Sequence, residues 1–159
     1  WLTPYDNRDW HTSTGEDAYR RALYTHWRRS SPYPSMLTFD GAARDVCQSR
    51  RLRTNTPLQA LNLLNDRAYL DCAAALGRTM AAAGATDPAQ AVSDATLRLL
   101  GRPPRESETR NLLALREKAQ AEFARDEAAA KKFGDSVDHA AWTLVANAML
   151  NLDEVVTKQ

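Results

Sequence analysis

The sequence predicts an all-α fold, an irregular bundle of about five helices preceded by an arm rich in arginine and aromatic residues. Composition carries this prediction, because the chain has 27 alanines and 19 leucines but only six valines and no isoleucine. Alanine and leucine favour helices, whereas a large sheet needs β-branched residues in its interior. Signals for helix starts and stops also recur from residue 56 onward. We therefore expect an arm over residues 1–55 and a helical bundle over residues 56–159, together forming one domain.

The arm carries one segment whose secondary structure is ambiguous, at residues 20–29. Leu23, Thr25 and Trp27 alternate with other side chains, which fits a short strand and favours a small β ribbon, also considered at Trp1–Thr3. A short helix over the same residues is the alternative. Residues 30–35 are expected to lack regular structure because they contain Pro32 and Pro34.

Thr56, Pro57 and Gln59 predict the first helix of the bundle. Thr56 fits the N-cap, proline is preferred at the first helical position, and a glutamine three residues after the cap completes a capping box. Leu58, Leu61 and Leu64 then form one stripe along the helix.

Further helices are predicted by the same kinds of signal, a capping residue at the start and a glycine or proline after the end. The expected elements are a helix from Asp66 to about Ala83 with Gly84 as its C-cap, one from Asp87–Pro88 to Gly101, a long helix over 106–125, a short one over 127–133, and a last helix capped by Ser136. We expect this last helix to reach Asp153 and Glu154, whose charges would oppose the helix dipole there and favour a basic partner.

Charge and motif content exclude several classes of function. The chain has 21 basic and 20 acidic residues, so its net charge of +1 does not draw it to nucleic acid. Apolar runs are too short to span a membrane. The chain has two cysteines, Cys47 and Cys72, no C-x-x-C-H haem motif and no histidine spacing typical of a metal site. We therefore expect no metal or cofactor in this chain, we identify no catalytic residues, and we expect His139 to be exposed.

An arginine cluster is the strongest local feature. Residues 20–53 contain eight arginines and two aspartates, a net charge of +6. Guanidinium groups form forked, bidentate contacts with anions and carboxylates, so two interpretations stay open. In one, the cluster binds an anionic group, with the candidates Arg28, Arg29, Arg50, Arg51, Arg53, Asn55 and Thr56. In the other, the arginines form structural ion pairs, with the acidic candidates Asp40, Asp66, Asp153 and Glu154.

Four stretches of the sequence resemble a known family. They are RRALYTHWRRSSPYPSMLTFD (20–40), VCQSRRLRTNTPLQALNLLND (46–66), LGRPP (100–104) with the later Glu108, and AAWTLVANAMLNLDE (140–154). Together they resemble the C-terminal part of the planctomycete secreted domain family of unknown function, often fused to planctomycete-type cytochrome c domains. The resemblance implies export to the periplasm or the cell exterior, and haem elsewhere in a longer protein. The chain departs from the family pattern at Arg105, where a small hydroxyl residue usually opens a helix.

Two functions are compatible with these features. The first is a non-catalytic structural or interaction module at the C-terminus of a large exported protein, with the rest of that polypeptide and an anionic ligand or polysaccharide as partners. The chain begins with Trp1 rather than methionine, which we take to indicate a fragment. The alternative is part of an enzyme acting on an anionic, for example sulfated, polysaccharide and completed by an N-terminal region. Pairing of the two cysteines and the oligomeric state are left open.

Overall fold

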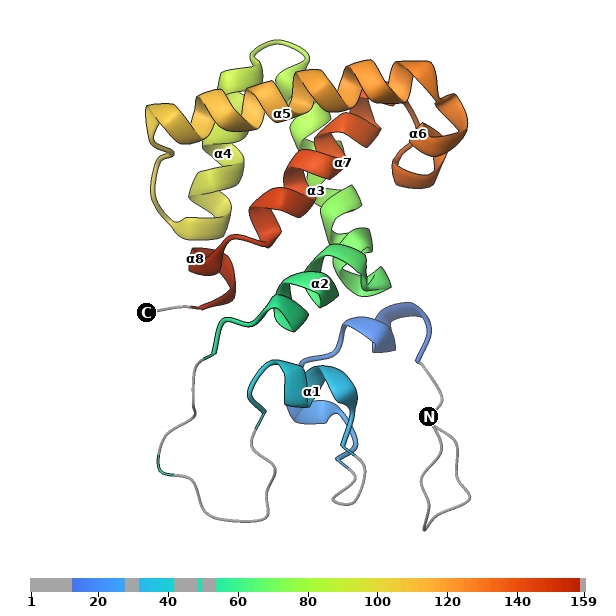
Figure 1. Cartoon of the computed structure of the whole chain (residues 1–159), viewed down its shortest axis with the longest axis vertical. Coiled ribbons are helices and arrows are strands. Elements are labelled where there is room, and N and C mark those ends of the chain that lie inside the picture. Colours follow the sequence, from blue (N-terminus) through green and yellow to red (C-terminus); the bar gives the residue numbers. More distant parts are fainter. Residues whose placement is uncertain (1–12, 28–31, 42–48, 50–53, 158–159) are drawn as a thin grey trace. The chain divides into compact units, whose positions relative to one another are not determined.

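Every regular element in the described part of the chain is helical (Figure 1). The computed structural model describes residues 13–27, 32–41, 49 and 54–157, and within them it contains no strand. Two 3₁₀ turns, η1 (Gly15–Tyr19) and η2 (Ala22–Tyr24), precede eight α-helices, of which six have seven or more residues. The all-α prediction is confirmed for these residues. The chain divides into two compact units, Trp1–Asn62 and Leu63–Gln159.

The strand favoured within residues 20–29 is wrong where the structure describes that segment. Ala22–Tyr24 forms a 3₁₀ turn in which the Thr25 backbone N–H donates to the Ala22 carbonyl at 3.2 Å. This local i to i+3 hydrogen bond satisfies the backbone without a partner strand. The other strand considered, Trp1–Thr3, lies outside the described residues.

Two short helices follow, and the second extends past Asn62, where the N-terminal unit ends. Helix α1 (Pro34–Thr38) begins at Pro34, which corrects the expectation that residues 30–35 are irregular. Proline is tolerated at the first helical position because the N–H it lacks would have no partner inside the helix. Helix α2 (Pro57–Asn65) starts as predicted: the Gln59 N–H donates to Thr56 Oγ1 at 3.3 Å, and the Thr56 N–H donates to Gln59 Oε1 at 3.0 Å. The capping box is therefore confirmed.

The structure has six further helices in its described part, and all but the short α8 begin close to the predicted residues. They are α3 (Arg67–Gly84), α4 (Pro88–Leu100), α5 (Glu106–Arg125), α6 (Glu127–Phe133), α7 (Val137–Leu150) and α8 (Asp153–Val156). Asp66, Asp87, Asp126 and Ser136 accept hydrogen bonds from backbone N–H groups as N-caps. Gly101 ends α4 with φ of 71°, a left-handed conformation that glycine adopts without strain.

The end of the chain differs from the prediction, because the last long helix stops at Leu150 and a separate short helix, α8, follows. Asp153 and Glu154 therefore lie in the first turn of α8 rather than at the end of a long helix. At a helix N-terminus the dipole favours acidic side chains, so the expected repulsion is absent.

Helix α7 is the centre of the C-terminal unit and contacts α3, α5 and α6 (Figure 1). Trp142, Val145 and Met149 of α7 are buried in one core cluster with residues of α3 and α4, including Met80 and Val92. Residues on nearly all sides of α7 are buried, as in a helix enclosed by others.

Two glycines of α3 allow α7 to approach closely. A Cβ atom added at Gly77 would lie 2.7 Å from the backbone N and Cα of Thr143, so no side chain fits between the two helices there. A Cβ atom added at Gly84 would lie 2.6 Å from Cζ2 of Trp142. Gly84 is the last residue of α3 and Ala85 is its C-cap, so the expected role of Gly84 as a C-cap is wrong. Its small size serves packing instead.

Replacing Gly77 with alanine should lower the free energy of unfolding by about 2 kcal/mol or more, because the new methyl group overlaps the backbone of α7. At an ordinary helical site the same change would raise it by about 1 kcal/mol, through helix propensity. The urea midpoint, read at unchanged slope, measures the difference. The control is Ala82→Gly at an exposed position of α3, with an expected loss of about 1 kcal/mol. A stabilised Gly77→Ala variant would contradict the close contact.

Candidate functional site

Gln59 organises the described part of the N-terminal unit, where it is the one buried residue. Its side-chain Nε2 donates to the Thr38 carbonyl at 2.8 Å and to Thr54 Oγ1 at 3.1 Å. Its Oε1 accepts from the backbone of Thr56. The amide therefore joins α1, the segment before α2 and the first turn of α2. A buried amide is stable only when its donors and acceptor are matched in this way.

Asp40 extends this network. Its carboxylate accepts from the Thr54 backbone N–H at 2.8 Å and from Thr54 Oγ1 at 2.9 Å. Asp40 also has φ of 56°, a left-handed conformation that is uncommon for residues other than glycine. The contacts with Thr54, and the bond from the Asp40 backbone N–H to the Leu37 carbonyl at 3.3 Å, hold the backbone in this conformation. The contact between Asp40 and Thr54 thus joins the end of α1 to the segment before α2, 14 residues later in the sequence.

The structure places some of the predicted anion-binding residues and not others. Arg28, Arg29, Arg50, Arg51 and Arg53 lie outside the described residues, so their role stays a prediction. Asn55 is exposed, and Thr56 is half-buried in the capping box.

The acidic residues predicted to pair with the arginine cluster lie in different elements of the structure. Besides Asp40, Asp66 caps α3 by accepting from the Ala68 N–H at 2.9 Å. Asp153 accepts from Thr157 Oγ1 at 3.4 Å within α8. Glu154 forms an ion pair with Arg102, a residue outside the N-terminal arginine cluster.

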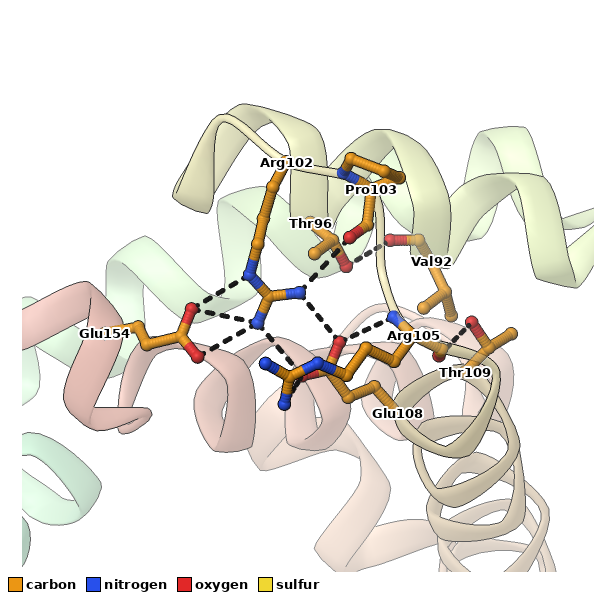
Figure 2. A network of polar contacts seen from close by, with 8 residues as sticks. All are labelled: Val92, Thr96, Arg102, Pro103, Arg105, Glu108, Thr109 and Glu154. Atoms are coloured by element: carbon orange, nitrogen blue, oxygen red, sulfur yellow. Dashed lines mark hydrogen bonds and ion pairs between the residues drawn. The ribbon is translucent and has the colours of Figure 1, made fainter.

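Arg102 is the centre of the most extensive polar network in the C-terminal unit (Figure 2). Its Nη1 and Nη2 each donate to Glu108 at 2.9 Å, and its Nε and Nη2 each donate to Glu154 at 3.0 Å. A further bond joins Nη1 to the Pro103 carbonyl at 3.2 Å. The network connects the segment after α4, the first turn of α5, and α8.

All five N–H groups of Arg102 have an acceptor in this arrangement, so the guanidinium offers no donor to an added anion. Hydrogen bonds from Arg102, and next from the Arg105 backbone N–H, lower the pKa of Glu108 from its ordinary value near 4.5 to about 2. The two carboxylates raise the pKa of Arg102 in turn. The network is a structural junction between three elements.

The sequence analysis did not single out Arg102, although a signal was present. Arg102 lies between the left-handed Gly101 and the two prolines Pro103 and Pro104, which restrict its backbone. Glu108, six residues later, stands at the third position of α5 and reaches back to the Arg105 N–H at 2.7 Å. An arginine and a glutamate fixed at this spacing could have been predicted to pair, whereas Glu154, 52 residues away, could not.

His139 is buried, contrary to the expected exposure. Its Nδ1 lies 3.1 Å from the Asp135 backbone N–H, and its Nε2 lies 3.0 Å from the Ala74 carbonyl. With its proton on Nε2, the ring accepts a hydrogen bond at Nδ1 and donates one from Nε2, which satisfies both neighbours. The ring therefore joins α3 to the start of α7 through hydrogen bonds, as a structural histidine does.

Arg116 is stacked on Trp142, with its Cζ 4.8 Å from the ring centroid, and its Nη2 donates to Asp138 at 2.7 Å. This cation–π contact covers the central tryptophan from the α5 side.

The described residues contain no group of three or more histidine, cysteine or acidic side chains placed to hold a metal ion. No helix in the same part of the chain is long and apolar enough to cross a membrane. Cys72 carries an exposed free thiol, and Cys47 lies outside the described residues.

A family model named PSD1, with the description "Protein of unknown function (DUF1553)", matches residues 2–116. The match includes the first three of the four stretches that carry the resemblance and ends before α6. The family is associated in Planctomycetes with cytochrome c-containing proteins. No curated protein and no solved structure matches the chain.

Replacing Glu108 with glutamine should lower the free energy of unfolding near pH 7, and the difference from the unchanged protein should shrink on acidification. The folded pKa of Glu108 lies below its ordinary value, so its ionised form stabilises the fold above about pH 4.5. That stabilisation is lost as the pH falls from there toward about 2. Urea unfolding between pH 7 and pH 3 measures the difference. Glu106→Gln, at a 91% exposed side chain, is the control, and a pH-independent difference for Glu108→Gln would refute the pairing.

Replacing Arg105 with serine should raise the free energy of unfolding by about 1 kcal/mol. A serine hydroxyl at this N-cap position can accept a hydrogen bond from a backbone N–H in the first turn of α5, whereas the arginine side chain cannot. Arg105 already has the extended backbone of an N-cap, with φ of −73° and ψ of 155°. Its 3.9 Å contact with Glu108 is largely exposed and contributes little. Arg105→Ala is the matched control, since it removes the same arginine and adds no cap. Equal urea midpoints for the two variants would show that no cap forms.

Proposed function

Because the chain belongs to the PSD1 family of proteins of unknown function (DUF1553), we propose that it is a non-catalytic interaction module of a larger exported protein. Its partner in this proposal is the rest of the same polypeptide. Export and haem elsewhere in that polypeptide are parts of the proposal that come from the resemblance.

The observation that carries the proposal is the distribution of apolar side chains in the N-terminal unit. Leu23 is 71% exposed, Tyr24 66%, Tyr19 56% and Leu37 50%. The buried residue in the described part of this unit is the polar Gln59. In the described part of this unit, hydrogen bonds hold Gln59 inside while these four apolar side chains face outward.

The described part of this unit contributes little of the usual source of folding free energy. Burial of apolar surface is the dominant favourable term in folding, and small domains have little stability to spare. Exposed clusters of tyrosine and leucine are typical of surfaces that meet another protein surface. A partner surface over η1, η2 and α1 would bury these side chains and add to the free energy of folding.

The polar clusters of the described residues support a structural role more than a catalytic one. The guanidinium of Arg102 and the amide of Gln59 are both engaged by neighbouring groups. The alternative of an enzyme acting on an anionic polysaccharide rests on arginines outside the described residues. No described residue adds an observation in its favour, and binding of an anionic ligand by those arginines stays a prediction.

Amide hydrogen exchange tests the proposal by comparing this chain alone with the same residues in the longer polypeptide. We expect the amides of η2 and α1 to exchange at least about tenfold more slowly in the longer polypeptide, because a partner surface covers them there. The amides of α7, buried in both, provide the internal reference.

A matched pair of variants makes the comparison specific. Leu23→Asp in the longer polypeptide should restore fast exchange in η2, whereas Leu97→Asp, at a 55% exposed residue of α4, should not. Equal exchange of η2 and α1 in the isolated chain and the longer polypeptide would overturn the proposal.

A further inference from the structure

The break between α7 and α8 has no glycine or proline to cause it. Residues 137–157 contain neither of these residues, which commonly end or bend a helix. The sequence predicts one helix that continues to Glu154, yet α7 ends at Leu150 and α8 begins at Asp153 (Figure 1). This difference points to a contact with another part of the fold as the cause of the break.

One backbone torsion accounts for most of the difference between the bent arrangement and a continuous helix. Leu152 has φ of −67° and ψ of 137°. Its φ is already close to the value of about −63° in an α-helix, whereas its ψ would have to change to about −42°. Asn151, with φ of −90° and ψ of 3°, needs a smaller change. Leu152 is therefore placed to act as a hinge.

Little buried apolar surface holds α8 in its bent position. Among the described helices from α3 onward, α8 is the one with no buried residue. Leu152, just before α8, is 42% exposed, and Val156, its last residue, is 36% exposed. Segments with so few buried apolar groups open at low free energy, so a polar contact can decide the position of α8.

The ion pair between Arg102 and Glu154 ties α8 to the segment after α4 (Figure 2). Arg102 Nε and Nη2 each donate to the Glu154 carboxylate at 3.0 Å, which makes a forked contact. Glu108 and the Pro103 carbonyl accept the other N–H groups of the guanidinium, so Arg102 is held independently of α8. Because Glu154 lies two residues beyond Leu152, rotation at this hinge carries its carboxylate away from Arg102.

Backbone hydrogen bonds and side-chain charges favour opposite states of this segment. A continuous helix would give the last carbonyls of α7 new partners in the N–H groups of residues 153 and 154. The same helix would place the carboxylates of Asp153 and Glu154 near its C-terminal end, where the dipole disfavours them. The ion pair with Arg102 adds a modest amount to the bent state, since its two side chains are 28% and 52% exposed. Small contributions of opposite sign are what a two-state element requires.

We propose that α7 and α8 form a conformational switch between the bent state, held by Arg102 and Glu154, and a continuous helix from Val137 to Val156. The structure shows the bent state. In the continuous state the Nε donor and one Nη2 donor of Arg102 are released, and together they form a forked edge that matches a carboxylate. The switch therefore controls the direction of the chain after α7 and the availability of this guanidinium edge. It concerns the C-terminal unit alone and stands independently of the proposed function.

The Cα and carbonyl chemical shifts of Leu152 test the proposal, because they differ between helical and extended backbone. In the unchanged chain we expect a helical Leu152 in less than about 10% of molecules. Asp153→Ala is the matched control, since it removes an acidic side chain from the same turn and leaves the ion pair. Glu154→Ala should raise the ratio of helical to extended Leu152 about fivefold more than this control does, because it also removes the ion pair.

A double substitution tests whether the effect depends on Arg102. Arg102→Ala should raise the same ratio, and adding Glu154→Ala to it should raise the ratio no further, because both changes remove one contact. The amide spectrum of the buried residues of α7 verifies that each variant keeps its fold. A Leu152 that stays extended in every variant, equal rises for Glu154→Ala and Asp153→Ala, or additive effects of Arg102→Ala and Glu154→Ala would each overturn the proposal.

Discussion

The close contact between α3 and α7 is the constraint on which the C-terminal unit depends. Gly77 and Gly84 lie two turns apart on α3 and remove the side chains that would otherwise separate the two helices. The backbone of α7 at Thr143 then lies against α3, and Trp142 fills the space beside Gly84. The other contacts are arranged around this pair: Arg116 of α5 covers Trp142, and His139 reaches the carbonyl of Ala74 on α3. A unit rich in alanine can pack tightly in this way because its helices approach each other closely.

The two compact units use polar groups in different ways. In the C-terminal unit the Arg102 network joins α5, whose leucines pack against the core, to α8, which has no buried residue, so its bonds add to an existing core. In the N-terminal unit the Gln59 network holds the described elements while Leu23, Tyr24 and Leu37 remain exposed. The C-terminal unit therefore has an apolar core of its own. The exposed apolar side chains in the described part of the N-terminal unit are typical of a surface that contacts another protein surface.

Capping residues in the sequence were sufficient to predict most of the helices that follow residue 56. Capping residues such as Thr56, Asp66 and Ser136 act within three residues of their own position, so their helices start where the sequence indicates. Contacts between distant residues could not be predicted in the same way. The partner of Glu154, the burial of His139 and the packing of Gly84 against Trp142 depend on how helices are placed in space. The burial of Gln59 likewise involves a contact with Thr38, which lies 21 residues away.

The central claim is that the apolar side chains of the N-terminal unit meet another surface of the same longer protein. A crystal structure of the longer polypeptide tests this most directly, through the exposed fractions of Leu23 and Tyr24, which are 71% and 66% in the chain alone. The account predicts that both fall to about 10% or less, as for residues in the core of an interface. Values that remain near those of the isolated chain, with no protein surface against either side chain, would contradict it.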